Sequence, residues 1–482
     1  MSPTWPDDWT TPWLSLLPSD ARLDLRGVPP DVAAGLSDRA SAGGDALVGW
    51  RLTRSDLPPI EPYRAVALFE PSRISPAWLR HQGFAHLRHL SVIPSLRNPR
   101  WLLPSDARRA AARGWDLYNP QSGRGRLAKA AARALTGALG SAPLGRALLI
   151  AHRSCPPIDE ILIRTLGTID YRLSLAPRWP GPRRRLAAWL ATPEGRELLF
   201  VKHRISMQAT TPAGEVLAYI KFATRPGAIE AIAHEARITA HVAGLGLTAG
   251  AVPRLLHDGG GNGGYLSVSA PLAIGSVPSE PVLGRVHQDL LRELARQTAA
   301  ENTGSLLTRL TQRLDGFPAG VDEPWRDRFA RGIAAVRGIP SVLELPASLA
   351  HGDFVPWNLR WDPVSGRLAV FDWEQAQLAL FPLYDCFHFQ IQANMLLRHL
   401  DAPTNVTRTL RTTLESPLPG ALGLAPAQVA ALLVAYLLEA NLRWFEDHRT
   451  LPDLPTLATS PYQALRRSML ESAIGEVASC RL

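Results

Sequence analysis

The chain has 482 residues, enough for two or three domains, and a net charge of +9. Hydrophobic residues make up 46% and charged residues 20% of the chain, which excludes a disordered protein and is typical of a soluble globular one. The three cysteines, Cys155, Cys386 and Cys480, are few and far apart. Their spacing argues against a disulfide framework or a zinc site and favours a reducing cytoplasm.

Targeting and membrane segments are not expected. The first twenty residues contain Asp7, Asp8 and Asp20 but no Lys or Arg, whereas a secretory signal needs a basic start. The longest apolar run, at residues 429–438, is too short to cross a bilayer and predicts a buried helix. The sequence therefore predicts a cytoplasmic protein without a transmembrane segment.

The positive charge is concentrated in the first part of the chain. Residues 73–185 contain 20 Lys and Arg against five Asp and Glu, a net +15, while the rest of the chain carries a net −6. Such a segment could bind an anionic partner. Nucleic acid is not the expected partner, because the sequence contains no recognisable nucleic-acid-binding module. A solvated Arg-rich surface is the preferred interpretation. Four arginines, Arg97, Arg100, Arg108 and Arg109, together with Tyr118, could form an anion site, but an exposed basic face is again the preferred interpretation.

The pattern of residues 1–180 predicts an α/β domain of unknown role. Strands are expected at 65–69, 86–93 and 146–152, and helices at 75–82, 106–113, 126–139 and 158–166. Residues 94–104 contain three prolines and predict an extended segment. The proline-rich stretch 177–182 is typical of a linker, so this domain is expected to be separate from the rest of the chain.

The next segment predicts two strands and a helix. Residues 201–210 and 215–223 alternate in polarity around the turn 211–214. The second strand carries Lys221, one of only three lysines in a chain with 49 arginines. Because arginine is used almost everywhere else, this position is interpreted as one that needs the compact ammonium group of lysine. Glu235 follows fourteen residues later on a helix expected at 228–242, beside its apolar face.

A glycine cluster at 259–264 lies between two strand-like pieces and lacks a following helix and a Lys. It predicts a turn, not a phosphate loop. A strand is expected at 265–270, and helices at 283–297 and 325–336 lead to the next motif.

The stretch His351-Gly352-Asp353-Phe354-Val355-Pro356-Trp357-Asn358 is the most informative one. Asp372 lies fourteen residues after Asn358, and the residues between them follow a strand, turn, strand pattern with Asp362-Pro363 and Ser365-Gly366 in the middle. Because a hairpin brings its two ends together, Asp353, Asn358 and Asp372 are expected to converge.

Phosphoryl transfer from a nucleotide needs this set of groups. One carboxylate orients the acceptor hydroxyl and takes its proton, and an Asn with a second Asp binds the magnesium ion that bridges the phosphates.

The motif resembles the catalytic loop and metal site of the aminoglycoside phosphotransferase and choline kinase family, relatives of protein kinases. That pattern is His-Gly-Asp, then Pro, then Asn, and later Asp-Trp-Glu, here Asp372-Trp373-Glu374. The resemblance covers residues 186–400 and extends loosely to the C-terminus. It implies that Asp353 is the catalytic base and that Asn358 and Asp372 are metal ligands, with His351 holding the loop backbone.

The resemblance also implies a nucleotide site. Lys221 would bind the α- and β-phosphates, with Glu235 steadying it and Glu230 as a substitute for Glu235. Backbone groups near Ala270 and Leu272 would meet the adenine. The chain departs from the family at the glycine-rich loop, because no GxGxxG occurs near residues 203–206, which puts phosphate binding by that loop in doubt.

The fold expected is α+β and bilobal, of the protein-kinase-like class, preceded by the separate basic domain at 1–180. A small β-rich lobe is expected at 186–275 and a large helical lobe at 276–482. The function expected is a small-molecule kinase that uses ATP and Mg²⁺ and moves the γ-phosphoryl group to a hydroxyl of an aminoglycoside, amino alcohol or sugar.

Several points stay open at the level of the sequence. An acidic acceptor pocket could use Asp401, Glu415, Glu439 or Glu446. Asp385 is interpreted as a residue that starts a helix or braces the loop, and Glu374 has no assigned role. The alternatives to a kinase are a catalytically silent nucleotide-binding regulator and a bifunctional enzyme with a second activity in the N-terminal domain.

Overall fold

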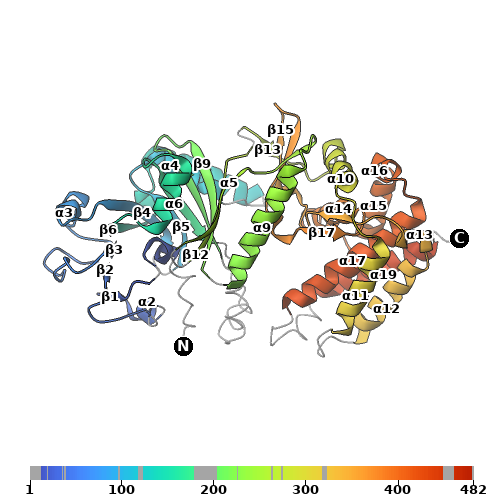
Figure 1. Cartoon of the computed structure of the whole chain (residues 1–482), viewed down its shortest axis with the longest axis horizontal. Coiled ribbons are helices and arrows are strands. Elements are labelled where there is room, and N and C mark those ends of the chain that lie inside the picture. The colour runs from blue at the N-terminus through green and yellow to red at the C-terminus, as the bar shows by residue number, and fades with distance from the viewer. Residues whose placement is uncertain are drawn as a thin grey trace. The chain divides into compact units, whose positions relative to one another are not determined.

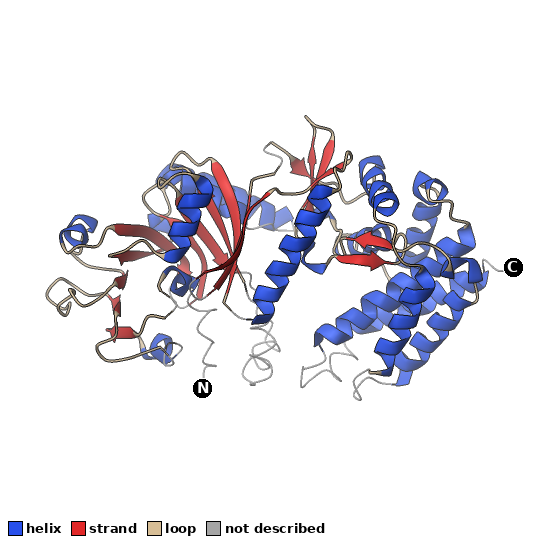
Figure 2. Cartoon of the chain, viewed as in Figure 1, coloured by secondary structure: helices blue, strands red, loops and turns tan. Residues whose placement is uncertain are grey.

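A computed structural model describes residues 12–95, 98–117, 123–177, 204–261, 264–272, 275–316, 323–448 and 461–479, apart from positions 19, 35, 37, 38 and 225. The chain forms two compact units. The first unit contains Met1–Ala236 and Leu255–Pro271, and the second contains Arg237–Arg254 and Leu272–Leu482. Figure 1 labels their elements, and Figure 2 shows that strands dominate the first unit and helices the second.

One large mixed sheet organises the first unit. Its strand order is β1-β2-β3-β6-β4-β5-β7-β8-β9-β12-β11. The strands are β1 (Leu23–Arg26), β2 (Ala46–Trp50), β3 (Ala65–Phe69), β4 (His86–Ser95), β5 (Asn98–Pro104), β6 (Arg146–His152), β7 (Arg172–Pro177), β8 (Ile205–Thr210), β9 (Val216–Ala223), β11 (Leu255–Gly261) and β12 (Gly264–Ser269).

Strand β3 is apolar on both faces because both of its faces are covered. β1, β2 and β3 run parallel, and every residue of β3 is buried. Alternate residues of β3 enter two different clusters: Ala65, Ala67 and Phe69 face one, and Val66 and Leu68 face the other. A continuous apolar run is the expected signature of such a doubly covered strand.

Most elements expected from the sequence between residues 65 and 166 are confirmed. Beside β3, β4 and β6, the helices are α3 (Pro76–His81), α4 (Arg108–Gly114), α5 (Gly123–Leu139) and α6 (Pro157–Leu166). The extended segment is strand β5. The sequence did not predict β1, β2, β7, the short helix α2 (Pro30–Ala34) or the 3-10 helix η1 (Pro12–Leu16).

The expected separation of a domain at residues 1–180 from the small lobe is not confirmed. β7 pairs antiparallel with β8 from Arg172↔Thr210 to Pro177↔Ile205. One buried cluster runs across this junction and includes Leu173 and Leu175 on one side and Met207 and Ile220 on the other. The strand ladder and core are therefore continuous where a linker was expected, although residues 178–182 of that stretch lie outside the described residues.

The strands and the helix expected after this junction are present. β8 and β9 form an antiparallel pair whose turn contains Gly214 at a φ of +89°. β12 pairs with β9 and with β11, so the glycine cluster belongs to a hairpin, as expected. Helix α9 (Pro226–Gly244) follows β9 and supplies Ala228 and Ile232 to a small cluster with Ala223.

Helices form most of the second unit. They are α10 (Arg285–Gln297), α11 (Thr303–Asp315), α12 (Glu323–Arg337), α13 (Pro340–Leu343), α14 (Tyr384–Leu396), α15 (Ala402–Leu414), α16 (Pro417–Ala421), α17 (Pro426–His448) and α19 (Pro461–Ser479). The apolar run 429–438 lies in α17 and is buried throughout, which confirms the expected core helix. No helix in the described ranges is long and apolar enough to span a membrane.

A short sheet in the second unit contains the expected hairpin. β15 (Leu359–Asp362) and β16 (Arg367–Val370) pair antiparallel, and Leu359 lies opposite Val370. β13 (Val277–Pro278) and β10 (Gly250–Ala251) flank them. A second pair, β14 (Ser348–Ala350) and β17 (Gln377–Leu380), encloses the motif on both sides in sequence.

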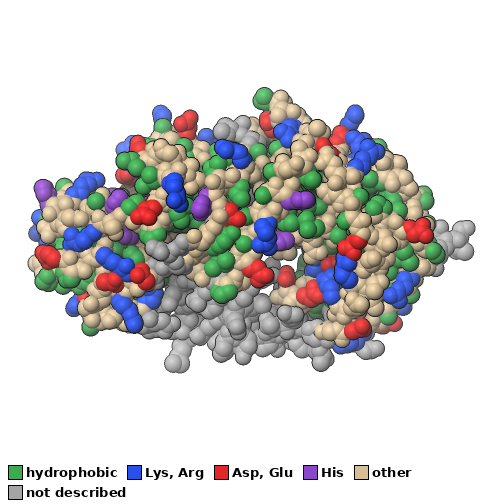
Figure 3. All heavy atoms as spheres, viewed as in Figure 1, with side chains coloured by type: hydrophobic (Ala, Val, Ile, Leu, Met, Phe, Trp, Pro, Cys, Tyr) green, Lys and Arg blue, Asp and Glu red, His purple; other side chains and the backbone are tan. Residues whose placement is uncertain are grey.

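The described part of the basic segment is partly neutralised by ion pairs. Asp116 is paired with Arg113, Lys129 and Arg133, and Asp106 with Arg172. Figure 3 shows basic and acidic side chains interspersed on the face of the molecule that it draws. Arg97, Tyr118 and the side chain of Arg100 lie outside the described residues. An anionic partner for residues 73–185 stays an untested prediction.

The continuous sheet predicts that the small-lobe strands will not fold well alone. A truncated chain that begins at residue 204 loses β7 and exposes Met207 and Ile220, which are at most 1% exposed in the full chain. It is expected to aggregate or to melt well below the full chain. A monomeric truncated chain that melts within about 5 °C of the full chain would contradict this continuity.

Candidate active site

Asp385 holds the backbone of the motif in place. Its carboxylate accepts the backbone N–H of His351 through Oδ2 at 2.7 Å and that of Gly352 through Oδ1 at 3.0 Å. Asp385 lies in the first turn of α14 and is 4% exposed. Burial raises the pKa of its carboxyl, and the two N–H groups counter that effect. The expected bracing role of this residue is confirmed.

Gly352 is required by the conformation of the loop. Its φ is +77°, which favours glycine, and a Cβ atom there would lie 2.2 Å from the carbonyl oxygen of Gln375. The chain can therefore turn sharply between the bonds to Asp385 and the side chain of Asp353.

His351 ties the two ends of the motif together, as expected. It is fully buried, and its Nδ1 accepts the backbone N–H of Asp353 at 3.2 Å. Nε2 lies 2.8 Å from the carbonyl oxygen of Phe371, so the ring proton must be on Nε2. The imidazole thus links Asp353 to the residue directly before Asp372.

Asn358 is oriented by Asp353. Its Nδ2 donates to the backbone oxygen of Asp353 at 3.0 Å and to Oδ2 of the carboxylate at 2.9 Å. A carboxylate cannot donate, so the amide nitrogen must face Asp353 and the amide oxygen Oδ1 must face elsewhere. That oxygen is the atom a hard cation would use.

Sequence analysis missed His388, which contacts the other oxygen of Asp353. His388 is on α14, and its Nε2 lies 3.2 Å from Oδ1 of Asp353. Its Nδ1 lies 3.3 Å from the hydroxyl of Tyr436, a residue of α17. Because the carboxylate only accepts, Nε2 carries the proton, and the phenol of Tyr436 donates to Nδ1 of the neutral ring.

These neighbours set the charge of Asp353. Burial disfavours the ionised form, but the hydrogen bond from His388, followed by electrostatic interactions with His388 and His351, lowers the pKa of this carboxyl. Burial also raises the pKa of Tyr436, so the phenol keeps its proton. The result is an ionised carboxylate held from both sides, with the side chain still 35% exposed.

Asp372 is brought to the loop by the hairpin, as predicted. The N–H of Phe371 donates to the carbonyl oxygen of Asn358 at 3.0 Å, which continues the β15–β16 ladder by one step. Asp372 follows with a φ of +67°, a strained conformation for a non-glycine residue and one that is common at functional sites. Its charge acts on Asp353, where it opposes ionisation.

The oxygen atoms in this region are suited to a divalent cation such as Mg²⁺. Carboxylate oxygens of Asp372 and Glu374 lie within 4.8 Å of each other. Two like charges this close repel unless a cation lies near them. The free orientation of Asn358 Oδ1 adds a neutral oxygen donor, which fits the ligands of magnesium. Glu374, whose role the sequence did not decide, is thus a candidate metal ligand beside Asn358 and Asp372.

In the first unit, Lys221 and Glu235 form the expected pair. Nζ of Lys221 lies 2.6 Å from both carboxylate oxygens of Glu235, and the two side chains are 27% and 13% exposed. β9 positions the lysine and α9 the glutamate. Ala270 and Leu272 follow β12 and are half-buried. The contact of these two residues with adenine stays a prediction. The same holds for phosphate binding by the Lys221–Glu235 pair, for the catalytic role of Asp353, and for metal binding by Asn358 and Asp372.

The four acidic residues considered for an acceptor pocket have structural partners. Glu439 is buried between Arg313 and Arg443, and Glu446 also pairs with Arg313. Asp401 caps the start of α15, and Glu415 ends that helix beside Arg411. None of the four offers an uncompensated carboxylate of the kind a cationic acceptor would need.

The bracing of the loop predicts a stability change for Asp385→Asn. An amide offers one acceptor oxygen, so one of the two buried N–H groups loses its partner, at a cost of about 1–3 kcal/mol in the free energy of unfolding. Denaturant unfolding measures this change. Asp401→Asn is the matched control, because Asn caps a helix as well as Asp does. Equal stability of the two variants would refute the bracing.

Comparisons with known proteins give a match in the part of the chain that contains the candidate site. Residues 207–411 match the model of the phosphotransferase enzyme family, which is less than half of the chain. No curated protein matches the chain.

Solved structures show weaker likeness. A GDP and kanamycin complex of APH(2″)-IIia is 12% identical, covers 58% of this chain and 91% of its own, and has a TM-score of 0.36. Macrolide 2′-phosphotransferase MphH from Brachybacterium faecium is 17% identical, with coverages of 55% and 88% and a TM-score of 0.33. A choline/ethanolamine kinase family protein from Mesorhizobium loti is 17% identical, with coverages of 61% and 98% and a TM-score of 0.28. Such low TM-scores assign neither a fold nor a substrate.

The motif residues from Lys221 to Asp385 all lie inside the matched range. The match supports a kinase-like fold of mixed α and β content for this range. Residues 207–411 of this chain are thus similar to the phosphotransferase enzyme family.

Proposed function

We propose that this chain is a small-molecule kinase that uses ATP and Mg²⁺ and moves the γ-phosphoryl group to a hydroxyl of its acceptor. The observation that carries the proposal is the Asp353 carboxylate, which Asn358 and His388 hold on both oxygens while part of it stays open to solvent. The acceptor class, an aminoglycoside, an amino alcohol or a sugar, is part of the proposal, and the family match supports the phosphotransfer itself.

In this mechanism Asp353 orients the acceptor hydroxyl towards the γ-phosphorus. A carboxylate with a lowered pKa is a weak base, so it takes the proton late, as the new P–O bond forms and the bond to the β-phosphate oxygen breaks. ADP leaves with the electrons of that bond, and the phosphate ester remains on the acceptor. No covalent bond to the enzyme is needed.

Asn358 and Asp372 would hold the magnesium ion, with Glu374 beside them. When bound, the ion neutralises charge on the phosphates. Lys221 would bind the α- and β-phosphates, and Glu235 would fix the direction of its ammonium group. Catalysis would then consist of positioning and charge neutralisation.

A screen of acceptors tests the proposal directly. Wild-type protein with Mg-ATP, and in parallel Mg-GTP, is offered aminoglycosides, macrolides, amino alcohols and sugars, and nucleotide consumption is measured. With the acceptor found, Asp353→Ala should lower turnover by about 10²–10⁴-fold and leave Mg-ATP affinity within about threefold, because the residue orients the acceptor and not the nucleotide.

The control is Asp401→Asn, which should keep wild-type turnover. Wild-type protein that binds Mg-ATP yet phosphorylates nothing in the panel would contradict the proposal and favour a nucleotide-binding regulator. Activity retained by Asp353→Ala would place the catalytic residue elsewhere.

The His388 contact predicts a shift in the pH profile. Loss of the hydrogen bond in His388→Ala leaves burial to raise the pKa of Asp353, so the carboxylate becomes protonated at higher pH than in the wild type. The acid limb of kcat/KM should therefore move to higher pH, because one hydrogen bond to the charged carboxylate is lost.

His388→Gln retains a donor of similar reach and should restore most of the wild-type limb, and His241→Ala, at an exposed position, serves as a control. An unchanged limb with uniformly lower turnover in His388→Ala would mean that the histidine only packs against its neighbours.

A further inference from the structure

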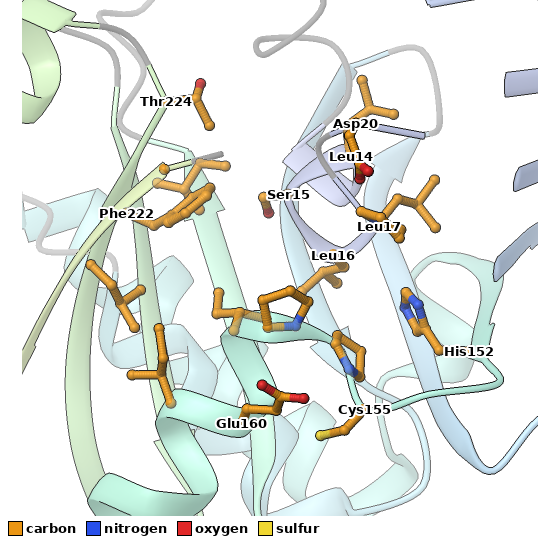
Figure 4. A pocket seen from close by; sticks show the side chains of 18 of the residues that line it. Leu14, Ser15, Leu16, Leu17, Asp20, His152, Cys155, Glu160, Phe222 and Thr224 are labelled. Carbon is orange, nitrogen blue, oxygen red and sulfur yellow. The ribbon is translucent and has the colours of Figure 1, made fainter. Parts of the chain in front are cut away.

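A cavity of about 680 Å³ lies inside the first unit and has no part in the mechanism above. Its walls come from η1, the residues after β6, the start of α6, and strands β8, β9 and β12. Figure 4 shows the labelled side chains around it. The volume is within the range of small-molecule sites, which span about 300–1,000 Å³.

Most of the wall is apolar. The apolar lining residues include Leu14, Leu17, Ile158, Ile161, Phe222 and Leu266. Phe222 places the cavity on the face of β9 opposite Lys221, because neighbouring residues of a strand point to opposite sides. A ligand here would not meet the Lys221–Glu235 pair.

His152 is a buried polar residue of this wall. It is 3% exposed, and its Nε2 has no hydrogen-bond partner among the described residues. Burial lowers the pKa of the ring to about 4, so it is neutral at pH 7, although a hydrogen bond with the Leu16 backbone has the opposite effect. Buried polar atoms nearly always have partners, so a ring nitrogen without one, in a residue that lines the cavity, points to a ligand group that would satisfy it.

The charged groups of the wall leave no cation free for an anionic ligand. Arg64 pairs with Asp20 at 2.9 Å and with Asp45 at 2.5 Å. Arg39 donates to the carbonyl oxygens of Pro18 and Ala21. Glu160 adds a further carboxylate. The balance favours a neutral molecule.

We propose that this cavity binds a neutral, mainly apolar small molecule whose hydroxyl group hydrogen-bonds to Nε2 of His152. A hydroxyl can donate or accept, so it satisfies this nitrogen in either tautomer of the ring. The apolar walls take the rest of the molecule. The site is a second small-molecule site and does not depend on the proposed phosphotransfer.

Cys155 provides a built-in reporter, because its half-buried thiol lines the cavity. The full-length protein is labelled with a thiol reagent, and the peptide that contains Cys155 is quantified by mass. The probes are 2-naphthol and 2-methylnaphthalene, which have the same shape but differ in the hydroxyl. At a 2-naphthol concentration ten times its Kd, labelling should slow about tenfold, because only the free protein reacts.

Two variants and a control locate the probe. His152→Leu should weaken 2-naphthol about fivefold and leave 2-methylnaphthalene unchanged, since only the hydroxyl bond is lost. Ile161→Trp fills the cavity from α6 and should abolish protection by both probes. His81→Leu, at an exposed position of α3, should behave as the wild type.

Melting temperatures show whether each variant folds. If His152→Leu does not fold, Ile161→Trp alone tests whether the probes bind in the cavity. Two results would overturn the proposal. One is wild-type labelling that neither probe slows at its solubility limit. The other is equal affinity of the two probes for the wild type, because the hydroxyl would then have no partner.

Discussion

The candidate active site depends on one buried carboxylate that holds two consecutive backbone N–H groups. Asp385 fixes His351 and Gly352 at the point where the chain leaves β14, and everything downstream takes its direction from there. Gly352 turns the chain, His351 ties Asp353 to the far end of the hairpin, and Asn358 is then held by Asp353. This short loop can be rigid because Phe354 and Val355 are buried in the core and its polar groups are satisfied by a helix that is itself buried.

The same loop shows how a carboxylate can be kept ionised where burial alone would protonate it. His388 and Asn358 occupy one lone pair on each oxygen of Asp353, and the remaining lone pairs are available to an acceptor. Asp372 and Glu374 add negative charge nearby, which is costly without a cation. The arrangement thus favours Mg²⁺ binding and hydroxyl orientation by the same few residues.

Local patterns in the sequence predicted the parts of this site that are close in sequence. Asp353, Asn358 and Asp372 could be joined because a hairpin with recognisable turn residues separates them, and Lys221 could be paired with Glu235 through a strand followed by a helix. His388 could not be found in this way. It reaches Asp353 across 35 residues from a helix that is buried nearly all round, so no periodicity distinguishes it from a core residue.

The N-terminal region was harder to predict for a related reason. β3 and β6 have continuous apolar runs and were recognised. β1 has only four residues, two of them charged, and β2, although as long as β3, contains Gly49 and follows the turn-forming residues 43–45. The pairing of β7 with β8 is a long-range backbone contact that leaves no signal in composition, and the prolines after β7 suggested a linker instead. The cavity beside His152 likewise depends on segments far apart in sequence.

The most direct measurement is a crystal structure of the full-length protein with Mg²⁺ and a non-hydrolysable ATP analogue. The account predicts an ion bound by Asn358 Oδ1 and a carboxylate oxygen of Asp372 at about 2.1 Å, bridging phosphate oxygens. An ion held by other residues, or a triphosphate bound away from Asp372, would contradict it.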